Sequence, residues 1–322
     1  MRWQNVKAEL LAAGSARLSG EPAEEYIAKS AAGPGAGGEG SVFFSQGRHR
    51  VRLALDEMSG IEIVHRGGGV ADLFFKNLSL SGRLDRPGLH CPEQAYITIT
   101  GSCIFHCRYC AVPRIRGHRK TIDEIVRMVE SVRDRVTAIS LTSGVQTTVE
   151  DEEAYVLDVV RALQPFGLPV GVSIYPTEQT PDLLHELGVT EVKFNTEAAT
   201  EKIFKEVCPG HDYGLIRQVL ERSVDLFGKN RVFSNVIVGL GETDAEMEQC
   251  IRILARLGVI PVLRPLNPVE GFTGYTRPSA DRLVKLLAVH EQALADEGLD
   301  PREAQTMCTN CTGCDLVPGR DT

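Results

Sequence analysis

The chain has 322 residues, of which 43% are hydrophobic and 24% charged, and its formal net charge is −8. This composition is ordinary for a soluble globular protein, and the length suits one barrel-sized domain with additional material, or two domains. The acidic balance argues against a general nucleic-acid binder, which normally carries a basic face. One local basic cluster is expected to be a solvated loop, or else to meet an acidic partner: Arg108, Arg114, Arg116, Arg119 and Lys120.

The sequence gives no sign of membrane insertion or secretion. No segment reaches the ~18 consecutive apolar residues of a membrane span, and the first residues lack the apolar core of a signal peptide. Nine cysteines are an odd number, and six of them form two tight triplets. This usage favours metal ligation in a reducing cytosol over a disulfide framework, so we expect a cytoplasmic protein.

Residues 1–92 are expected to form a small α+β extension. Residues 6–18 could form one helix, and residues 31–40 are a glycine-rich loop. Three short alternating runs predict strands, at residues 41–44, 50–54 and 62–65. Gly67-Gly68-Gly69 fits a plain turn better than a phosphate cradle, because it does not match the spacing of a dinucleotide motif.

From residue 93 to 298 strands and helices alternate, which predicts parallel strands joined by right-handed crossovers. Six such units suggest an α/β fold of the (β/α)6 partial-barrel type, and periodicity alone leaves an open doubly wound sheet as the alternative. A cysteine-containing tail, 299–322, follows. The predicted strands are 95–100, 138–142, 169–173, 191–195, 231–239 and 260–265, and the predicted helices are 122–135, 152–164, 181–186, 215–227, 244–257 and 280–297.

Three cysteines, Cys103, Cys107 and Cys110, follow the first of these strands at spacings of four and three. The C-terminal ends of barrel strands are where active sites are built. Cubane iron–sulfur clusters normally take four thiolates, so three close cysteines would leave one iron open for a ligand. A zinc site or three buried thiols are the alternatives, although zinc usually prefers two separated pairs of ligands.

This C-x3-C-x-aromatic-C pattern closely resembles the signature of the radical S-adenosylmethionine (SAM) superfamily. The resemblance implies a (β/α)6 core, and a [4Fe–4S] cluster whose open iron chelates the amino and carboxylate groups of SAM. It also implies that an electron from the cluster breaks a carbon–sulfur bond to give a 5′-deoxyadenosyl radical. Tyr109, the aromatic residue of the pattern, is then expected to contact SAM.

Polar residues end the second, third and fourth predicted strands. Thr142-Ser143-Gly144 occupies a place where radical SAM enzymes often hold the SAM amino group, although an ordinary turn would look the same. Ser173 is a candidate for hydrogen bonding to a ligand. Asn195 and Glu197 resemble the Asn-x-acidic element of biotin and lipoyl synthases that contacts SAM; the alternative is a helix N-cap with an acidic first turn.

The fifth strand ends in Gly239-Leu-Gly241-Glu242-Thr, which resembles the element that borders the adenine in biotin and lipoyl synthases. The resemblance to that branch covers residues 95–268. Arg264, on the sixth strand, points into the barrel or out of it depending on register. An interior arginine would resemble the one beside the second cluster of biotin synthase, and an ordinary ion pair is the alternative.

The tail carries a second triplet, Cys308, Cys311 and Cys314, with the C-x2-C-x2-C spacing typical of cubane ligation. Zinc binding or free thiols are the alternatives. The fourth ligand of a second [4Fe–4S] cluster could be Cys91, Cys208, a serine, an arginine or the substrate. Cys250 lies within a predicted helix and is expected to be a core residue.

The resemblance implies three hypotheses of function. The first is insertion of sulfur from the second cluster into an octanoyl chain on a carrier protein or lipoyl domain, as in lipoyl synthase. The tail position of the triplet departs from the usual pattern and is most similar to a two-protein lipoyl synthase. A homologous partner subunit and an electron donor such as ferredoxin or flavodoxin are therefore expected.

The second hypothesis is methyl transfer, carbon–carbon bond formation or dehydrogenation, with the second cluster carrying electrons or holding substrate. The third is a non-enzymatic iron–sulfur carrier, which would not explain the SAM-like strand ends.

Overall fold

The computed structural model describes residues 2–28, 40–114, 117–267 and 274–322. Its larger part is a curved sheet of six strands, ordered β12-β11-β10-β9-β8-β7, in which every neighbouring pair is parallel. A doubly wound sheet would reverse its strand order at a switch point, so that alternative is wrong. The strands are β7 (Gln94–Thr98), β8 (Ala138–Thr142), β9 (Val170–Ser173), β10 (Glu191–Lys193), β11 (Val232–Val238) and β12 (Ile260–Pro265).

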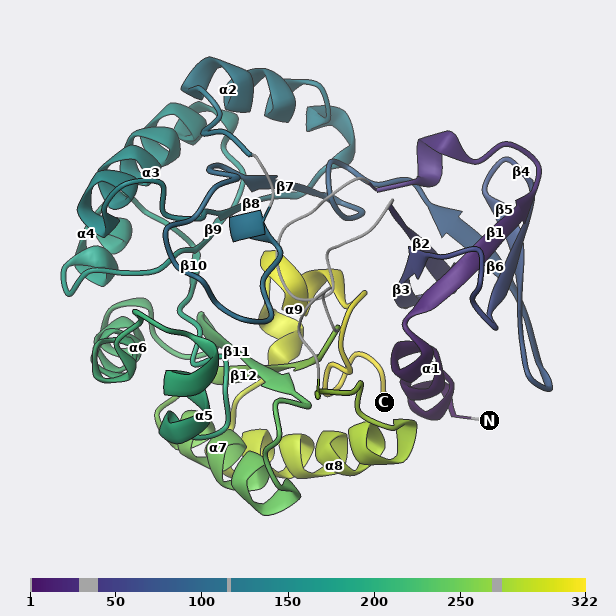
Figure 1. Cartoon of the computed structure of the whole chain (residues 1–322). Coiled ribbons are helices and arrows are strands. Elements are labelled where there is room, and N and C mark those ends of the chain that lie inside the picture. The colour runs from purple at the N-terminus through teal and green to yellow at the C-terminus, as the bar shows by residue number, and fades with distance from the viewer. Residues whose placement is uncertain (1, 29–39, 115–116, 268–273) are drawn as a thin grey trace.

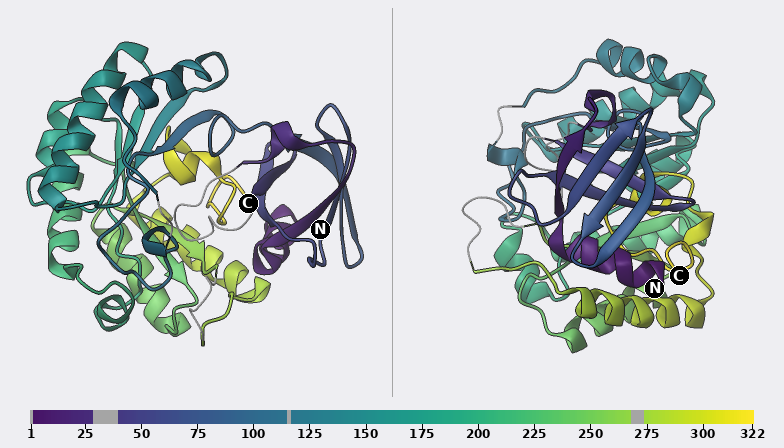
Figure 2. Two further views of the ribbon diagram at one scale, coloured as in Figure 1. Left: turned by 45° about the horizontal axis from the view of Figure 1, so that its top comes forward. Right: turned by 90° about the vertical axis from the view of Figure 1, so that its right-hand side faces the viewer.

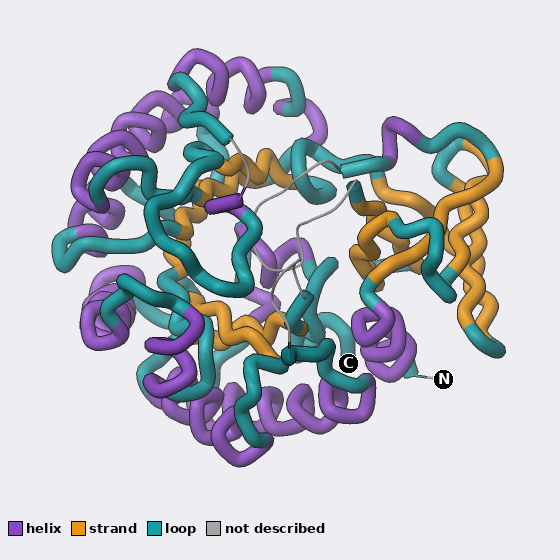
Figure 3. The backbone as a smooth tube through the Cα atoms, viewed as in Figure 1, coloured by secondary structure: helices purple, strands orange, loops and turns teal. Residues whose placement is uncertain are grey.

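Helices line the outer side of this arc, as Figures 1 and 3 show. Threonine begins several of them: Thr121 and Thr243 each form a reciprocal capping box with a glutamate three residues later. The helices predicted for the arc are present, α8 with its predicted ends and the others with shifted ends, and α5 was not predicted. The helices are α2 (Ile122–Glu130), α3 (Val149–Leu163), α4 (Thr180–Glu186), α5 (Glu201–Val207), α6 (Tyr213–Phe227), α7 (Asp244–Arg256) and α8 (Ala280–Glu297).

Short 3-10 turns supplement these helices. The last of the predicted residues 122–135 form such a turn, at Arg133–Arg135, instead of continuing α2. The others are Glu24–Tyr26, Val112–Arg114, Gln164–Phe166 and Pro301–Glu303.

The N-terminal region is a closed six-stranded β-barrel, not merely a set of short strands beside a helix. Its strand order is β1-β3-β2-β6-β5-β4, and β1 completes the ring by pairing in parallel with both β3 and β4. The elements are α1 (Trp3–Ala13), β1 (Ser15–Gly20), β2 (Ser41–Gln46), β3 (His49–Leu55), β4 (Glu62–Gly67), β5 (Val70–Phe75) and β6 (Leu78–Asp85).

The single helix predicted over residues 6–18 is wrong because Gly14 ends it. Gly14 has a left-handed φ of 77°, and its amide donates to the Leu10 carbonyl, so the chain leaves the helix and enters β1. The turn predicted at Gly67-Gly68-Gly69 is present, and the Gly69 amide donates to His65 Nε2 over 3.1 Å. Most of the glycine-rich loop predicted at 31–40 lies outside the described residues.

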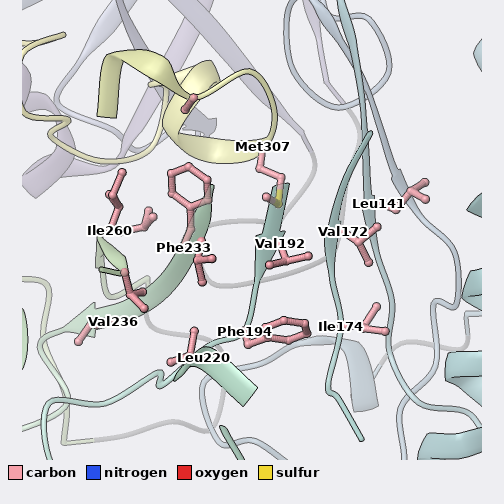
Figure 4. Packing of buried hydrophobic residues seen from close by; sticks show 14 of the residues in the cluster. Leu141, Val172, Ile174, Val192, Phe194, Leu220, Phe233, Val236, Ile260 and Met307 are labelled. Atoms are coloured by element: carbon pink, nitrogen blue, oxygen red, sulfur yellow. The ribbon is translucent and has the colours of Figure 1, made fainter. Parts of the chain in front are cut away.

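The C-terminal tail lies between the arc and the N-terminal barrel, with α9 (Met307–Cys311) near the centre in Figure 1. Glu191, at the start of β10, is fully buried and accepts hydrogen bonds from the Gln305 amide (2.8 Å), the Thr306 amide (2.8 Å) and the Thr306 hydroxyl (2.6 Å). Met307 belongs to the apolar core of the arc, in the same cluster as Phe233 (Figure 4). The tail is therefore part of the interior.

Contacts from the N-terminal barrel hold the other side of the tail. The Lys7 ammonium on α1 is completely buried, forms an ion pair of 2.7 Å with Asp321, and donates to the Thr312 carbonyl. The Arg52 amide on β3 donates to the Gly313 carbonyl over 2.6 Å. Figure 2 shows the barrel at the open side of the arc, with the tail between them. Among the described residues, no helix has both the length and the apolar composition needed to cross a membrane.

Candidate active site

Both cysteine triplets line one cavity of about 210 Å³ in the interior of the arc. The cavity also receives residues of the N-terminal barrel, Phe43 and Arg52. The sequence-predicted residues that line it are Cys103, Cys107, Tyr109, Cys110, Thr142, Ser143, Gly144, Ser173, Asn195, Glu197, Arg264, Cys308, Cys311 and Cys314. Residues 200 positions apart in the chain therefore share one site.

The first triplet lies on a loop after β7, which we call the cysteine loop (residues 101–111). Neighbouring segments fix its backbone: the Ile104 amide donates to Val145 (2.7 Å), and the Arg108 amide donates to Val207 (2.8 Å). Gly144 is required by packing, because a Cβ there would overlap the Ser102 carbonyl oxygen. The Val145 amide donates to Cys103 Sγ over 3.4 Å, which holds one of the three sulfurs in place.

Two further groups contact the cysteine loop from the segment after α5. Cys107 Sγ lies 3.6 Å from His211 Nε2, and the Tyr109 hydroxyl lies 3.4 Å from Cys208 Sγ. The ligand atoms of Cys107, Cys208 and His211 all lie within 4.8 Å of one another. Cys208 is thus a neighbour of the first triplet, whereas the sequence offered it as a ligand for the second.

Without a metal, these thiols favour the neutral form. Burial raises the pKa of Cys110 to about 12, and a hydrogen bond to Cys208 together with burial raises the pKa of Cys107. A metal cation reverses this preference, because a coordinating thiol loses its proton. The buried sulfurs therefore suit metal ligation better than free nucleophilic chemistry.

Glu197 is a strained and buried carboxylate at the end of β10. Its φ is 55°, a left-handed conformation that is unusual for a side chain of this size and typical of functional sites. Burial raises its pKa to about 7, although Tyr109 and Lys193 partly oppose this shift. Among the described residues, neither Glu197 Oε2 nor Asn235 Oδ1 has a hydrogen-bond partner, and both side chains line the cavity.

Asn195 orients this corner of the site, because its Oδ1 accepts a hydrogen bond from the Asn235 amide over 3.2 Å. Glu197 Oε2 and Asn235 Oδ1 are both buried acceptors without donors among the described residues, and leaving them unpaired costs free energy. A ligand that carries hydroxyl or ammonium donors would satisfy both.

The segment that follows β8 is held by a buried glutamate on α3, Glu152. Glu152 Oε1 accepts hydrogen bonds from the Ser143 hydroxyl (2.6 Å) and the Thr100 hydroxyl (2.7 Å), while its Oε2 pairs with Arg119 (2.7 Å). The Ser143 oxygen also accepts from the Thr100 amide over 3.0 Å. The Ser143 hydroxyl is therefore already hydrogen-bonded to Glu152 and Thr100, and these bonds fix the turn beside the cysteine loop.

The glycine-rich end of β11 does not line the cavity. The carboxylate of Glu242 accepts hydrogen bonds from the Gly239 and Leu240 amides, both at 2.8 Å, and pairs with Arg282 at 2.8 Å. Gly239 and Gly241 both have positive φ, at 115° and 97°, so this turn requires glycine. Here Glu242 shapes the turn, and its role toward a nucleotide stays a prediction.

The second triplet is surrounded by cationic side chains. Lys193 Nζ lies 3.6 Å from Cys308 Sγ, and Lys193 is only 3% exposed. Arg264 points into the interior and is hydrogen-bonded to Cys314; the Cys314 and Cys308 sulfurs raise its pKa against the opposing effect of burial. Two buried cations beside three thiols are the arrangement expected where those thiols are ionised.

Sequence reasoning missed Lys193 because its strand looks like any buried strand. The signal was the alternation Glu191, Lys193, Asn195, Glu197, in which every second residue is polar and faces the interior. The missed lining residues include His90, Tyr96, Thr98, Tyr175, His211 and Asn235.

The basic cluster predicted as a solvated loop is only partly exposed. Arg119 pairs with Asp151 (2.8 Å) as well as Glu152, and the Lys120 ammonium donates to the Thr98 carbonyl (2.7 Å). Arg108 and Arg114 are exposed, and Arg108 pairs with Glu206 over 3.2 Å. Arg116 lies outside the described residues.

Comparison with known proteins identifies the superfamily. The family model described as "Radical SAM superfamily" matches residues 97–254, which contain the cysteine loop and the strand ends described above. Among curated proteins, lipoyl synthase of Corynebacterium diphtheriae is 29% identical over 189 residues, covering 55% of this chain and 52% of its own. Lipoyl synthase of a Nocardioides species is 30% identical over 197 residues, covering 55% and 60%. The chain thus spans about half the length of these relatives.

Solved structures share the fold. A radical SAM methyltransferase from Sphaerobacter thermophilus superposes with a TM-score of 0.54 at 18% identity, covering 77% of this chain and 76% of its own. The FeFe-hydrogenase maturase HydG from Carboxydothermus hydrogenoformans superposes with a TM-score of 0.53 at 18% identity, covering 63% and 52%. At such identities the likeness concerns the fold alone.

The superfamily implies a [4Fe–4S] cluster and SAM, and the residues present fit both groups. The cysteine loop supplies three thiols to the cavity, one fewer than a fully ligated cubane requires. Glu197 and Asn235 supply buried acceptor oxygens that lack donors among the described residues. The family match, the shared fold and this set of groups lead to one conclusion: the chain belongs to the radical SAM superfamily.

Proposed function

We propose that this radical SAM enzyme removes a hydrogen atom from an unactivated carbon and inserts sulfur from a second [4Fe–4S] cluster, held by Cys308, Cys311 and Cys314. The observation that supports this proposal best is the shared cavity: the two triplets face a common space. A substrate in that space would lie between the group that generates a radical and the group that carries sulfide.

The residues of the chain would bind, orient and exclude water. The cluster and SAM would together supply one-electron cleavage of SAM. Glu197 and Asn235 would accept hydrogen bonds from SAM, because both line the cavity and each has a buried oxygen without a donor among the described residues. Asn195, which was predicted to contact SAM, also lines the cavity and holds the Asn235 backbone amide. Lys193 and Arg264 would balance the negative charge of the tail thiolates.

The proposed substrate is an octanoyl chain on a carrier protein or lipoyl domain. Curated relatives that share about half of their length with this chain are named lipoyl synthases, and a tail cluster inside the cavity suits sulfur transfer. A homologous partner subunit and an electron donor such as ferredoxin or flavodoxin complete this proposal.

A specific observation favours a second candidate. Polar side chains, among them Lys193, Asn195 and Asn235, line the cavity beside its apolar residues, so it is not the wholly apolar slot that an alkyl chain prefers. A substrate with a polar or anionic group near the reacting carbon would fit this lining. The tail cluster would then carry electrons or hold that substrate during methyl transfer, carbon–carbon bond formation or dehydrogenation.

Product analysis separates these candidates. The reduced, cluster-loaded protein would be incubated anaerobically with SAM and an octanoylated lipoyl-domain peptide, with and without a partner subunit. Sulfur insertion predicts 5′-deoxyadenosine together with a peptide that has gained sulfur, and loss of the sulfur product in Cys308→Ala. Cys250→Ala is the matched control, since this buried thiol lies on α7 outside the cavity.

If SAM is cleaved but no peptide gains sulfur under any of these conditions, the octanoyl proposal is wrong and the second candidate stands. If SAM is not cleaved at all, the third hypothesis, an iron–sulfur carrier, is favoured.

A further inference from the structure

A fourth buried thiol, Cys91, lies against the tail triplet. Its exposed fraction is 1%, and it lines the same cavity as Cys308, Cys311 and Cys314. Cys91 and Cys311 belong to one small buried cluster, together with Ala28 and Phe43. Four thiols therefore gather where the spacing pattern alone shows three.

The position of Cys91 is fixed by the segment that also holds the tail. The Cys91 carbonyl accepts a hydrogen bond from the Gly88 amide over 2.8 Å, and Cys91 forms an antiparallel bridge with Gln94. The Gln94 side chain donates to the Met307 carbonyl at the start of α9 over 3.0 Å. Gln94 thus links Cys91 to α9, the helix that carries Cys308 and Cys311.

Two of the other candidates for a fourth ligand, Cys208 and an arginine, lie elsewhere or have the wrong chemistry. Cys208 contacts Tyr109 beside the cysteine loop. Arg264 is hydrogen-bonded to Cys314, and a guanidinium is a donor without a free lone pair, so it suits a sulfur as counter-charge. Lys193 takes the corresponding place beside Cys308.

We propose that Cys91 is the fourth protein ligand of the cluster held by Cys308, Cys311 and Cys314; this rests on the second cluster of the proposed function. The four thiolates close the coordination of the tail cluster, whereas the cysteine loop leaves one iron open. The two clusters then differ in kind: SAM binds at the first, and the second reaches the substrate through its sulfides or through electron transfer.

The test uses a variant that holds only the tail cluster, Cys103→Ala/Cys107→Ala/Cys110→Ala. It would be loaded with the Mössbauer-active isotope of iron and measured as the full chain. With Cys91 intact, we expect no separate Mössbauer signal from an iron that lacks a thiolate ligand. Adding Cys91→Ala should shift about one quarter of the absorption to a distinct iron, which then binds added cyanide.

Controls in the same triple-variant background are Cys208→Ala and Cys250→Ala, which should leave the spectrum unchanged. Cys91→Ser keeps the volume of the side chain and should also produce a distinct iron, which covers the case in which Cys91→Ala fails to fold. A distinct iron already present with Cys91 intact, or a spectrum that Cys91→Ala and Cys91→Ser leave unchanged, overturns the assignment.

The outcome is independent of the sulfur-insertion assay. A four-thiolate cluster in a protein that forms no sulfur product leaves this assignment standing and rejects the proposed chemistry. A sulfur product from a protein whose tail cluster has only three thiolates supports the proposed chemistry and rejects the assignment of Cys91. A triple variant that never binds a tail cluster rejects both.

Discussion

Replacing Glu191 with alanine should release the tail from the interior of the arc. The fully buried carboxylate accepts three hydrogen bonds from Gln305 and Thr306, and it pairs with Arg231 over 3.0 Å. The Arg231 side chain is 26% exposed, so it can regain water, whereas Thr306 is fully buried and its donors are left without acceptors. Each buried donor left without an acceptor costs about 1–3 kcal/mol, so the two Thr306 donors together should cost about 2–6 kcal/mol.

The assay has a global and a local part. Denaturant unfolding gives the loss of stability, and iron analysis of the reconstituted protein reports the clusters. We expect the iron content to fall from about eight to about four per chain, because the cysteine loop is held by other contacts. Asp182→Ala is the matched control: its pair with Arg222 is about half exposed on both sides, so its loss should leave the unfolding free energy nearly unchanged.

A fully loaded tail cluster in Glu191→Ala, with an unfolding free energy within about 1 kcal/mol of the unaltered protein, would refute the reasoning. The tail would then be held by contacts other than those to β10.

Four further predictions follow from the same contacts. Lys7→Ala leaves Asp321 buried without its cation and should cost about 3–5 kcal/mol in denaturant unfolding, and Lys7→Met/Asp321→Asn should recover part of that loss. Gly144→Ala should displace the cysteine loop and lower its iron content, whereas Gly60→Ala should not, because the nearest atom to a Cβ there is Phe75 Cε2 at 4.0 Å, an ordinary contact. Glu197→Gln should weaken SAM binding by about 10- to 100-fold, measured by equilibrium dialysis, with the iron content unchanged. Burial lowers the pKa of His290 to about 3, so the unfolded state binds more protons than the folded state between that value and about pH 6.5. The unfolding free energy should therefore fall as the pH falls through this window. His290→Leu should reduce the slope of unfolding free energy against pH by up to ~1.4 kcal/mol per pH unit.

The sequence predicted the arc well because each of its strands and helices is specified by local pattern. The strands β8 and β12 have the predicted ends, and so does α8, where apolar runs or periodicity stop at a cap or a turn. The prediction failed at residues 6–18, where apolar residues continue through Gly14 and only the left-handed conformation of that glycine separates a helix from a strand.

The closed N-terminal barrel could not be predicted, because it depends on pairing between distant strands. β1 pairs with β3 and β4 in parallel, and no local turn signals such a connection. β5 and β6 form a hairpin through Lys76, whose φ is 53°, without the glycine that usually marks such a turn.

The candidate site could be predicted only in part, for the same reason. Both triplets could be predicted as metal ligands because their spacing is local. The shared cavity could not be predicted, since it depends on the contact between Glu191 and Thr306, 115 positions apart. The same holds for Cys91 and Cys311, which share one small buried cluster although they lie far apart in the sequence.

Counting iron and acid-labile sulfide in two variants that each lack one whole triplet, after anaerobic reconstitution, tests most directly whether each triplet holds its own cluster. The variants are Cys103→Ala/Cys107→Ala/Cys110→Ala and Cys308→Ala/Cys311→Ala/Cys314→Ala. We expect about eight irons per chain in the unaltered protein and about four in each variant, with SAM cleavage lost in the first. If the variant without the tail triplet retained every iron of the unaltered protein, the tail cysteines would hold no cluster.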